Sequence, residues 1–373
     1  MIIGIDGNEA NQAKRVGIGE YAFELLRQFK QFTVHSSQFT VKIYLKDRPL
    51  ADMPEETKNW KYVVVKPKKF WTQVGLPLKL VFEQEKPNVF FSPSHYAPRF
   101  APMPTAIAIM DVSYLKYPEL FKKKDLYQLV NWTKYSAKRA KVIFTISDAS
   151  KNDILKAYGK RPEQVIVTYP GLKQPTSNNK QDTDTMDILK QKYAVTKPYI
   201  LFVGTLQPRK NIVRLIEAFS QIKSQKDLDL VVVGKKGWLY EEILEAPKKY
   251  GVADRVKFLD FVSNEDLSLF YKNAELFILP SLYEGFGLPV IEAMSYGCPV
   301  ITSSVSSLPE AGGDAAVFVD PESVSDIAKK LEKVLTNKKL RGEMIKKGYL
   351  HIKKFSWEKT ARETLEALKS LAK

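Results

Sequence analysis

Short apolar runs alternate with helical patterns along the whole chain, and no other feature constrains the fold as strongly. Apolar runs of this kind are typical of parallel strands that helices bury on both faces. The pattern therefore predicts an α/β protein with parallel sheets. The predicted strands form two sets, 2–6, 41–45, 62–65, 88–92, 106–110, 142–147 and 164–169, then 199–204, 230–234, 255–260, 276–280, 299–303 and 315–320.

Two domains are expected, because 373 residues exceed the length that one ordinary core organises. The polar stretch TSNNKQDTDT separates the two sets of strands, so we interpret it as part of a surface link between domains. Each set of strands, with its intervening helices, predicts one doubly wound domain. Ligands of such folds bind beyond the carboxyl ends of the strands, which predicts a site in a cleft between the domains.

The composition is that of a globular protein without repeats. No long apolar stretch and no leader pattern occur, and the single cysteine, Cys298, cannot form an internal disulfide, so we expect a cytoplasmic protein. The net charge of +16 predicts affinity for an anionic partner, which could be nucleic acid, an acidic membrane or a phosphorylated substrate. The run KPKKFW at 66–71 resembles an interfacial membrane contact, although a solvated face is the more common role of such a run.

The stretch 281–303, SLYEGFGLPVIEAMSYGCPVITS, arranges two carboxylates and a glycine-rich loop around one predicted helix. Pro289 suits the first helical position and Gly297 the position just past the end, so Glu284 lies in the loop and Glu292 inside the helix. Backbone N–H groups at a helix start favour an anion such as phosphate, and carboxylates accept hydrogen bonds from hydroxyls. A sugar nucleotide would use every group in this stretch. Complementing the helix dipole could explain one glutamate but not the whole arrangement.

Arg209 and Lys210 follow the predicted strand 199–204 and precede a predicted helix. Cations are unfavourable near a helix N-terminus unless an anion lies there. We therefore predict that the pair neutralises a diphosphate leaving group, the alternative being two solvated side chains.

The first half of the chain contains weaker candidates. Gly17 and Gly19 match a dinucleotide fingerprint only formally, because that fingerprint should follow its strand immediately; their amides are still expected to open a helix directed at the cleft. His95, after strand 88–92, and Asp111, at the end of strand 106–110, are candidate acids or bases, although a loop histidine is more often structural. No Cys/His cluster or acidic run has metal-ligand spacing, so no metal is expected.

Taken together, these residues resemble glycosyltransferase family 4, the retaining enzymes of the GT-B fold, over nearly the whole chain. The most specific segment is LYEGFGLPVIEAMSYGCPVI, and GTLQPRKNIVRLIEAF, FLDFVSNEDL, GIGEYAFEL and TISDASKNDI are also similar. The resemblance implies two Rossmann-like doubly wound domains that face each other across a cleft. It implies an acceptor-side domain at 1–172, a linker at 173–196, a donor domain at 197–355, and a C-terminal helix at 356–373 that packs back on the first domain.

The resemblance also implies roles for individual residues. Glu284 would contact the transferred sugar, Glu292 would bind the nucleotide ribose, and Arg209 and Lys210 would hold the diphosphate. One position departs from the family pattern, because Met110 precedes Asp111 where many relatives have histidine, and a methionine can neither donate a hydrogen bond nor titrate. The further donor-binding positions are Gly17, Gly19, Gly204, Gly234, Phe261, Val262, Gly285, Phe286, Gly287 and Leu288.

WTQVGLPLKL and MDVSYLKYPELF are similar to the mannosyltransferase-like branch, which often uses GDP-mannose. The resemblance thus implies transfer of a hexose from a GDP- or UDP-hexose to a glycan or a polyprenyl- or lipid-linked acceptor, with no cofactor, in the cytoplasm or at the inner face of the cytoplasmic membrane. A same-face substitution needs neither a metal nor an enzymic nucleophile and fits the residues present. Alternatives are an epimerase-like or inactive protein of the same fold, or a basic membrane- or nucleic-acid-binding module. Nucleic acid is not expected as a partner, because the basic residues are spread over both halves.

Overall fold

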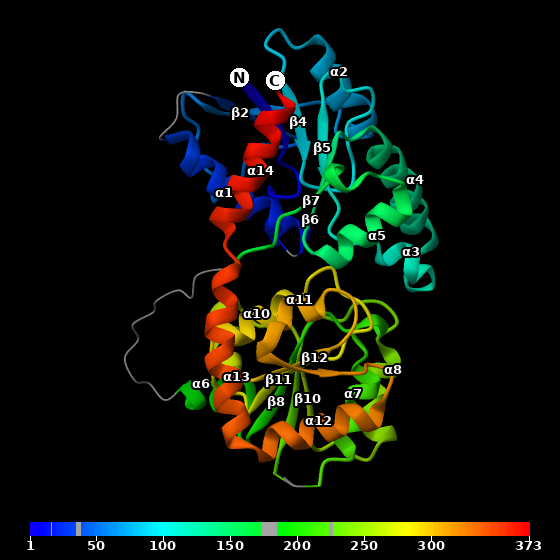
Figure 1. Ribbon diagram of the computed structural model, residues 1–373, viewed down its shortest axis with the longest axis vertical. Coiled ribbons are helices and arrows are strands. Elements are labelled where there is room, and N and C mark those ends of the chain that lie inside the picture. The colour runs from blue at the N-terminus through cyan, green and yellow to red at the C-terminus, as the bar shows by residue number, and fades with distance from the viewer. Residues whose placement is uncertain (16, 35–38, 173–184, 224–226) are drawn as a thin grey trace. The chain divides into compact units, whose positions relative to one another are not determined.

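The computed structural model describes residues 1–15, 17–34, 39–172, 185–223 and 227–373, which form two compact units (Figure 1). Unit 1 comprises Met1–Gly171 and Phe355–Lys373, and unit 2 comprises Leu172–Lys354. Of the predicted linker 173–196, residues 173–184 lie outside the described residues. Residues from 185 form a helix, α6 (Thr185–Tyr193), that packs against α9 (Asn264–Asn273) of unit 2. This part of the chain is therefore a helix that packs on unit 2.

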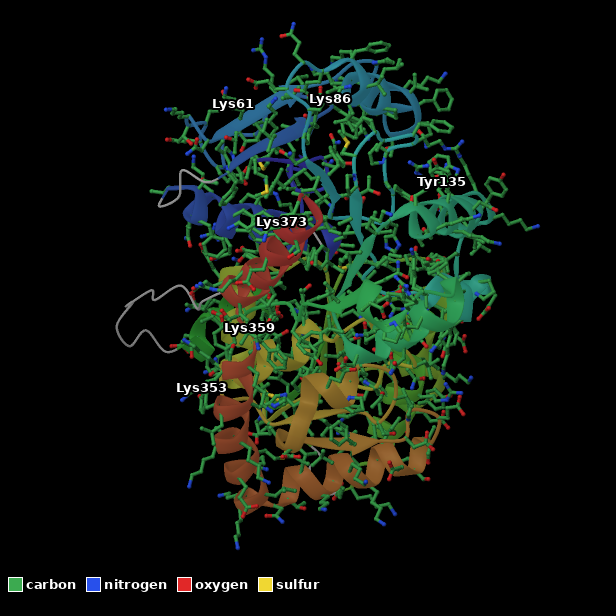
Figure 2. The ribbon with its side chains drawn as sticks, turned by 45° about the horizontal axis from the view of Figure 1, so that its top comes forward. Lys61, Lys86, Tyr135, Lys353, Lys359 and Lys373 are labelled. Carbon is green, nitrogen blue, oxygen red and sulfur yellow. The ribbon has the colours of Figure 1, made fainter. Side chains whose placement is uncertain are left out.

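Lysine side chains project from the surface of both units, among them Lys61 and Lys86 of unit 1 and Lys353 of unit 2 (Figure 2). In the described part of the chain, no helix combines the length and the apolar character needed to cross a bilayer.

Unit 1 contains a seven-stranded sheet in the order β3-β2-β1-β4-β5-β6-β7, and every neighbouring pair is parallel. Its inner strands are buried along their length, as the apolar runs of the sequence require. The strands are β1 (Ile2–Asp6), β2 (Thr40–Leu45), β3 (Trp60–Val64), β4 (Val89–Ser92), β5 (Thr105–Ala108), β6 (Val142–Thr145) and β7 (Val165–Val167).

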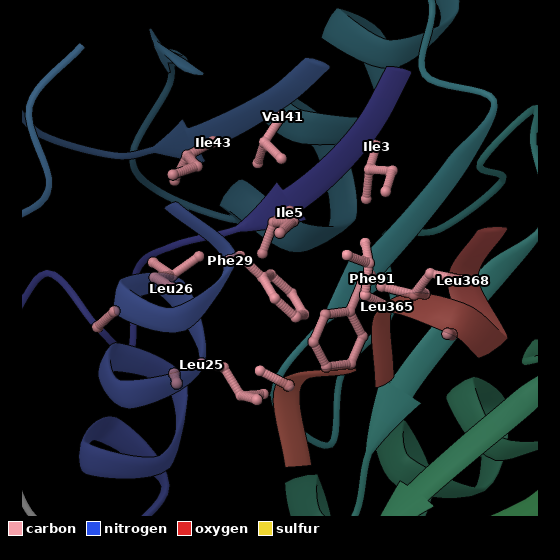
Figure 3. Packing of buried hydrophobic residues seen from close by; sticks show 14 of the residues in the cluster. Ile3, Ile5, Leu25, Leu26, Phe29, Val41, Ile43, Phe91, Leu365 and Leu368 are labelled. Carbon is pink, nitrogen blue, oxygen red and sulfur yellow. The ribbon is translucent and has the colours of Figure 1, made fainter. Parts of the chain in front are cut away.

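Helices α1 and α14, from opposite ends of the chain, pack against each other in unit 1 (Figure 1). Their apolar faces bury Phe29 and Leu368 in one cluster with Ile3, Ile5 and Phe91 of the sheet (Figure 3). The core of unit 1 therefore includes residues from the last helix of the chain. The helices of unit 1 are α1 (Ile18–Val34), α2 (Leu76–Phe82), α3 (Ser113–Lys116), α4 (Lys123–Arg139), α5 (Asp148–Tyr158) and α14 (Trp357–Leu371), with η1 (Trp71–Gly75), η2 (Pro118–Leu120) and η3 (Pro162–Gln164).

Unit 2 contains a six-stranded parallel sheet in the order β10-β9-β8-β11-β12-β13. Its strands are β8 (Tyr199–Val203), β9 (Asp229–Val233), β10 (Val256–Leu259), β11 (Leu276–Leu279), β12 (Val300–Ser303) and β13 (Ala316–Val319). Its other helices are α7 (Ile212–Ser220), α8 (Glu241–Lys249), α10 (Leu288–Ser295), α11 (Leu308–Gly312), α12 (Val324–Thr336) and α13 (Lys338–His351), with η4 (Pro208–Lys210), η5 (Gly313–Ala315) and η6 (Ile352–Lys354).

The predicted strands of both sets are confirmed, with ends that differ by two residues at most. Strand β5 ends at Ala108 rather than at 110. Its neighbour β4 pairs with it only as far as Ile107. Asp111 therefore lies in the loop beyond the strand and does not end it.

Candidate functional site

The order of the strands in unit 2 reverses between β8 and β11, which are neighbours at the centre of the sheet. Ligands of open parallel sheets bind beyond the carboxyl ends of the strands at such a reversal. Arg209 and Lys210 follow β8, and Glu284 follows β11. The topology therefore brings these three predicted residues to the position where this type of sheet binds ligands.

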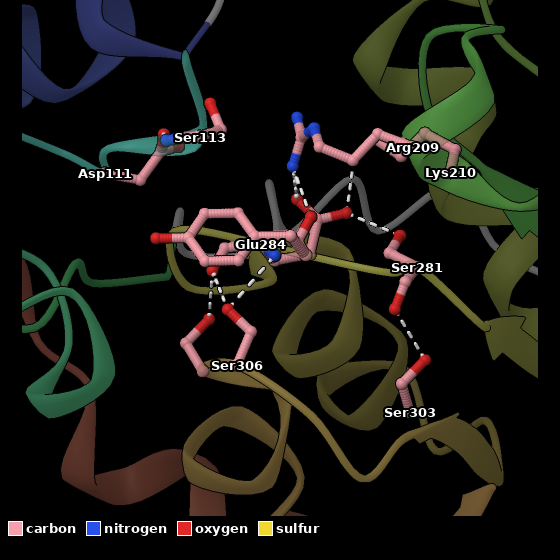
Figure 4. Close-up of polar contacts among 10 residues, drawn as sticks. Asp111, Ser113, Arg209, Lys210, Ser281, Glu284, Ser303 and Ser306 are labelled. Carbon is pink, nitrogen blue, oxygen red and sulfur yellow. Dashed lines mark hydrogen bonds and ion pairs between the residues drawn. The ribbon is translucent and has the colours of Figure 1, made fainter. Parts of the chain in front are cut away.

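Glu284 is buried and accepts hydrogen bonds from both cations (Figure 4). The Nζ of Lys210 lies 2.6 Å from its Oε1, and the Nη1 of Arg209 lies 3.3 Å from its Oε2. The hydroxyl of Ser281 donates a further hydrogen bond of 2.6 Å to Oε1. The side chains of Arg209 and Lys210 are only 15% and 12% exposed, so the cluster is largely shielded from solvent.

The charge of Glu284 is stabilised by its neighbours. Burial by itself raises the pKa of Glu284, but the charges of Lys210 and Arg209 and the hydrogen bonds from Lys210 and Ser281 lower that pKa to about 2. The sequence-based argument required an anion next to the two cations. Glu284 itself supplies an anion next to both cations.

Hydroxyl groups hold the backbone of the loop that carries Glu284. Ser306 and Ser307 donate hydrogen bonds of 2.6 and 2.9 Å to the carbonyl of Glu284. Arg209 also donates to the carbonyl of Tyr283. Ser281, Ser306 and Ser307 were not predicted; Ser281 lies in the motif itself, whereas the other two belong to a distant segment whose role no local pattern could reveal.

Helix α10 starts at Leu288 after Gly287, whose φ of 104° is a left-handed conformation that favours glycine. Pro289 is the second helical residue, and Gly297 lies just past the end with φ of 72°. The predicted helix is thus confirmed with a start one residue earlier. Phe286 in the preceding loop is buried.

Glu292 lies inside α10 and accepts a hydrogen bond of 3.1 Å from the hydroxyl of Tyr271 on α9. Tyr271 is buried and stacks on Tyr296, with ring centroids 5.8 Å apart. Burial and the carboxylate of Glu292 raise the pKa of Tyr271 well above its ordinary value, so this phenol stays protonated and its hydroxyl donates the hydrogen bond to Glu292. Tyr271 was not predicted, because only the packing of α9 on α10 brings it to Glu292.

Gly204 and Gly234 lie side by side where β8 and β9 end. The amide of Gly204 donates to the carbonyl of Val233, and a Cβ on Gly234 would lie 1.9 Å from the carbonyl oxygen of Gly204. Only glycine permits this approach. In the loop after β10, Phe261 is 66% exposed with the Lys235 amine 4.6 Å from its ring centroid, while Val262 is buried.

In unit 1, Gly17 and Gly19 lie at the start of α1, and a Cβ on Gly19 would lie 3.0 Å from the carbonyl oxygen of Glu9. Val16 lies outside the described residues. The left-handed φ of 52° at Gly17 and the close approach at Gly19 explain why both are glycine. No finding assigns either glycine to a ligand, so their donor-binding role stays a prediction.

His95 and Asp111 lie in the loops after β4 and β5 of unit 1. Burial lowers the pKa of His95, and the charge of Asp111 partly opposes this shift. Among the described residues, the Nδ1 of His95 is buried without a hydrogen-bond partner, whereas Asp111 accepts a 2.8 Å hydrogen bond from the Ser113 amide. Asp111 therefore starts the turn into α3, and a catalytic role of either residue stays a prediction.

Asp6, at the carboxyl end of β1, is a buried carboxylate that sequence reasoning missed. The order of unit 1 reverses between β1 and β4, so Asp6 lies at the reversal point of this sheet. Burial raises the pKa of Asp6 to about 6, although hydrogen bonds from the amide and the side chain of Asn8 lower it in part. A charged residue that ends an apolar run is the signal that could have identified it.

Met110, the position that departs from the family pattern, is partly buried against the main core cluster of unit 1. Its side chain therefore contributes packing at this position. Within the described residues, no group of three or more His, Cys, Asp or Glu is placed to hold a metal ion. Metal-independent chemistry itself stays a prediction.

Comparison with known proteins places these features in a family. The model of the family described as "Glycosyl transferases group 1" matches residues 185–351. The O-antigen chain mannosyltransferase B of Escherichia coli is 30% identical over 291 residues, which cover 77% of this chain and 75% of that protein. The serotype-specific mannosyltransferase WbdA of Escherichia coli is 31% identical over 237 residues, but these cover only 29% of that longer protein.

Solved structures establish the fold over the full chain. Anabaena Alr3699/HepE, solved in complex with UDP and glucose, has a TM-score of 0.75 at 19% identity and covers 99% of both chains. The sucrose-phosphate synthase of Thermosynechococcus elongatus has a TM-score of 0.72 at 19% identity, with 99% of this chain and 98% of that chain covered. At these identities the similarity concerns the fold alone.

Proposed function

Because the chain belongs to the glycosyl transferases group 1 family and has the GT-B fold, we propose that it transfers mannose from GDP-mannose, with retention of configuration, to a growing cell-surface glycan. The acceptor would be a glycan on a lipid carrier, and the protein would work in the cytoplasm at the inner face of the membrane. One observation carries the proposal: the buried cluster of Arg209, Lys210 and Glu284 at the strand reversal of unit 2.

The cluster supplies what departure of a nucleoside diphosphate requires. Two largely shielded cations lie at the expected ligand position, where low solvent exposure strengthens their attraction for a developing negative charge. A diphosphate would compete with Glu284 for these cations. When it binds, the Glu284 carboxylate becomes available to accept hydrogen bonds from hydroxyls of the transferred sugar.

The proposed reaction is a same-face substitution. The bond between the anomeric carbon and the diphosphate oxygen breaks, and the acceptor oxygen forms its bond to the anomeric carbon on the same face. The acceptor proton passes to the departing diphosphate oxygen, while Arg209 and Lys210 stabilise that oxygen's charge. Glu292, held by Tyr271, would accept hydrogen bonds from the ribose hydroxyls.

The choice of mannose is supported by relatives rather than by a residue of this chain. The matched relatives from Escherichia coli are mannosyltransferases by name, and one of them is named for the O-antigen chain. A solved structure of the same fold contains UDP and glucose, so a UDP-hexose is the alternative donor to test.

The test is incubation of the full chain with a panel of GDP- and UDP-hexoses without acceptor, with mass spectrometry of the products. The proposal expects slow release of GDP and mannose from GDP-mannose alone, since water then replaces the acceptor. Lys210→Gln and Arg209→Gln should abolish release, whereas Lys197→Gln, which alters an exposed ion pair of the same unit, should leave it unchanged.

Each other outcome has a defined meaning. Preferred release from a UDP-hexose would reject GDP-mannose as the donor but keep the site. Equal activity in Lys210→Gln and the wild type would reject the assigned site. A product with inverted configuration in acceptor assays followed by NMR would reject the retaining mechanism.

A further inference from the structure

One helical segment of unit 1, residues 71–82, packs one face against the core and exposes large apolar side chains on another. η1 runs directly into α2, so residues 71–82 form one continuous helical segment. Trp71, Leu76 and Leu80 are buried in a core cluster with Tyr44 and Phe90. The segment is therefore anchored firmly to the sheet and needs no further apolar contact to stay folded.

The opposite face of this segment is also apolar. Phe82 is 79% exposed, Phe70 60%, Leu78 51% and Val74 43%. Val74, Leu78 and Phe82 are four residues apart and lie along one side of the helical segment, and Phe70 directly precedes the segment. Phe100 is 69% exposed and belongs to the same region, because the amide of the preceding Arg99 donates a 3.2 Å hydrogen bond to the carbonyl of Thr72 in η1. Single exposed apolar residues are ordinary, but a row of this kind marks a docking surface.

The charges around this row favour an anionic partner. The segment 66–86 contains five exposed or half-exposed lysines, which are Lys66, Lys68, Lys69, Lys79 and Lys86. Its two acidic residues, Glu83 and Glu85, both pair with Lys42 of β2, at 3.2 and 3.3 Å. Glu83 is buried, whereas the side chain of Glu85 is 74% exposed, and Lys68 pairs with Asp47. The five lysines still outnumber the acidic residues of the segment, so its outer face carries a net positive charge. Lys61 and Lys86, labelled in Figure 2, extend the basic character along β3 and beyond α2.

We propose that Phe70, Val74, Leu78, Phe82 and Phe100 form a membrane-docking surface that inserts between the headgroups of an anionic lipid bilayer, with the surrounding lysines contacting lipid phosphates. A row of apolar side chains bordered by lysines is the composition that interfacial helices use, since each component finds its own layer of the bilayer. A protein partner would need an apolar patch bordered by acidic residues to match this surface. The surface goes beyond the proposed transfer reaction and does not depend on it, although a lipid-linked acceptor would make it useful.

Sedimentation with lipid vesicles tests the proposal in the full chain. The wild type should sediment with vesicles of phosphatidylcholine and phosphatidylglycerol, and not with phosphatidylcholine alone. Leu78→Ser with Phe82→Ser should weaken binding by at least about tenfold, because both side chains lose the transfer of apolar surface into the bilayer. These residues are exposed, so the folded unit should tolerate the change.

Matched controls come from unit 2. Leu239→Ser with Leu350→Ser removes two exposed apolar residues, 55% and 66% exposed, and should leave vesicle binding unchanged. Lys69→Glu with Lys86→Glu should weaken binding to the anionic vesicles, whereas Lys346→Glu with Lys347→Glu on α13 should have a much smaller effect for the same change in net charge.

A fluorescent label reports insertion directly. The only cysteine, Cys298, is buried, and burial raises its pKa, so it reacts poorly with thiol reagents. A polarity-sensitive dye attached after Phe82→Cys should shift its emission to the blue on addition of anionic vesicles. The same dye attached after Leu350→Cys should not shift.

The outcomes separate docking from the transfer reaction. Absence of vesicle binding, equal binding by wild type and Leu78→Ser/Phe82→Ser, or a concentration-dependent dimer that this pair abolishes would overturn the membrane surface, the last in favour of a second copy as the occupant. Nucleotide release measured on the same samples without vesicles tests the proposed function by itself. If the wild type binds vesicles but releases no nucleotide from any donor, the proposed transfer reaction is wrong and the docking surface stands.

Discussion

The pKa values of two buried carboxylates, Glu284 of unit 2 and Asp6 of unit 1, are shifted in opposite directions because their neighbours differ. Glu284 has two cations within hydrogen-bond distance, whereas Asp6 accepts hydrogen bonds from the amide and side chain of Asn8 and is influenced by the charge of Lys46 from farther away. The pKa of Glu284 is consequently lowered to about 2 and that of Asp6 is raised to about 6. The shifted pKa of each carboxylate predicts how the stability of its unit depends on pH.

Glu284→Gln should destabilise unit 2 by about 3 kcal/mol at neutral pH, because it leaves Arg209 and Lys210 largely buried without their anion. The folded pKa lies below the ordinary value of 4.5, so the stabilisation is fully present above pH 4.5 and is lost as pH falls towards 2. Urea unfolding should therefore give a constant difference between wild type and variant in the neutral range and a smaller one in acid. Glu265→Gln, an exposed change on α9, is the control and should show no such difference.

Asp6→Asn should make unit 1 more stable above pH 6, because burial raises the pKa of Asp6 and makes its charged form unfavourable. The folded pKa of about 6 exceeds the ordinary value of 3.8, so the wild type is stabilised below pH 3.8 by the protonated carboxyl and loses that stability as pH rises through 6. An asparagine oxygen can still accept from Asn8 without carrying the charge. The expected gain is about 1 to 3 kcal/mol at pH 7.5 and close to zero at pH 4, measured by urea unfolding. A gain that is equal at both pH values would contradict the raised pKa.

Among the elements, the strands were the most predictable part of the protein. Each predicted run became a strand because a parallel strand covered on both faces needs apolar residues at every position, which a single sequence displays directly. The ends were less predictable: β5 stops at Ala108, the last residue that pairs with β6, and the apolar run continues through Met110 into the core. The helical part of the predicted linker, α6, was missed because its short amphipathic pattern follows a polar stretch.

Helix α10 depends on a glycine at its start. Gly287 has φ of 104°, and a Cβ there would lie 2.7 Å from the Cδ2 of Leu308. Gly287→Ala should therefore cost about 1 to 3 kcal/mol of stability and shift the loop that carries Glu284, which should weaken nucleotide binding. Isothermal titration with GDP and thermal unfolding measure the two effects.

Gly342→Ala provides the matched control for this helix start. Gly342 lies inside α13, where a Cβ would meet no atom within 4 Å. Alanine should stabilise that helix by up to about 1 kcal/mol and leave nucleotide binding unchanged. Loss of binding in both variants, or in neither, would contradict a specific role of Gly287.

For the whole molecule, the chain returns to unit 1 after completing unit 2. Residues Phe355–Lys373 belong to unit 1, and α14 buries Trp357, Ala361, Leu365 and Leu368 in the core that Ile3 and Ile5 of β1 share. The first and last parts of the chain therefore complete one core. We therefore expect the core of unit 1 to be complete only when α14 is in place.

Leu368→Ala should test this dependence. Leu368 is fully buried, so the change should cost about 2 to 5 kcal/mol and speed hydrogen exchange of β1, α1 and α14. Leu331→Ala on α12, equally buried, should act instead on amides of unit 2. Exchange followed by mass spectrometry distinguishes the two patterns, and protection of α1 that Leu368→Ala leaves unchanged would contradict the shared core.

The amino-acid sequence was sufficient for the strands, the class of fold and the helix that follows Glu284, because periodicity, glycines and prolines act over a few neighbouring positions. It also singled out Glu284, Glu292, Arg209 and Lys210 as candidate site residues. It could not reveal that Glu284 is the anion of the two cations, that Ser306 and Ser307 hold its loop, that Tyr271 donates to Glu292, or that Asp6 is buried. These properties depend on groups that are far apart along the chain and meet only when the strand order is set. Ion pairs, burial and pKa shifts arise from contacts between these distant groups. Only the folded structure could therefore show them.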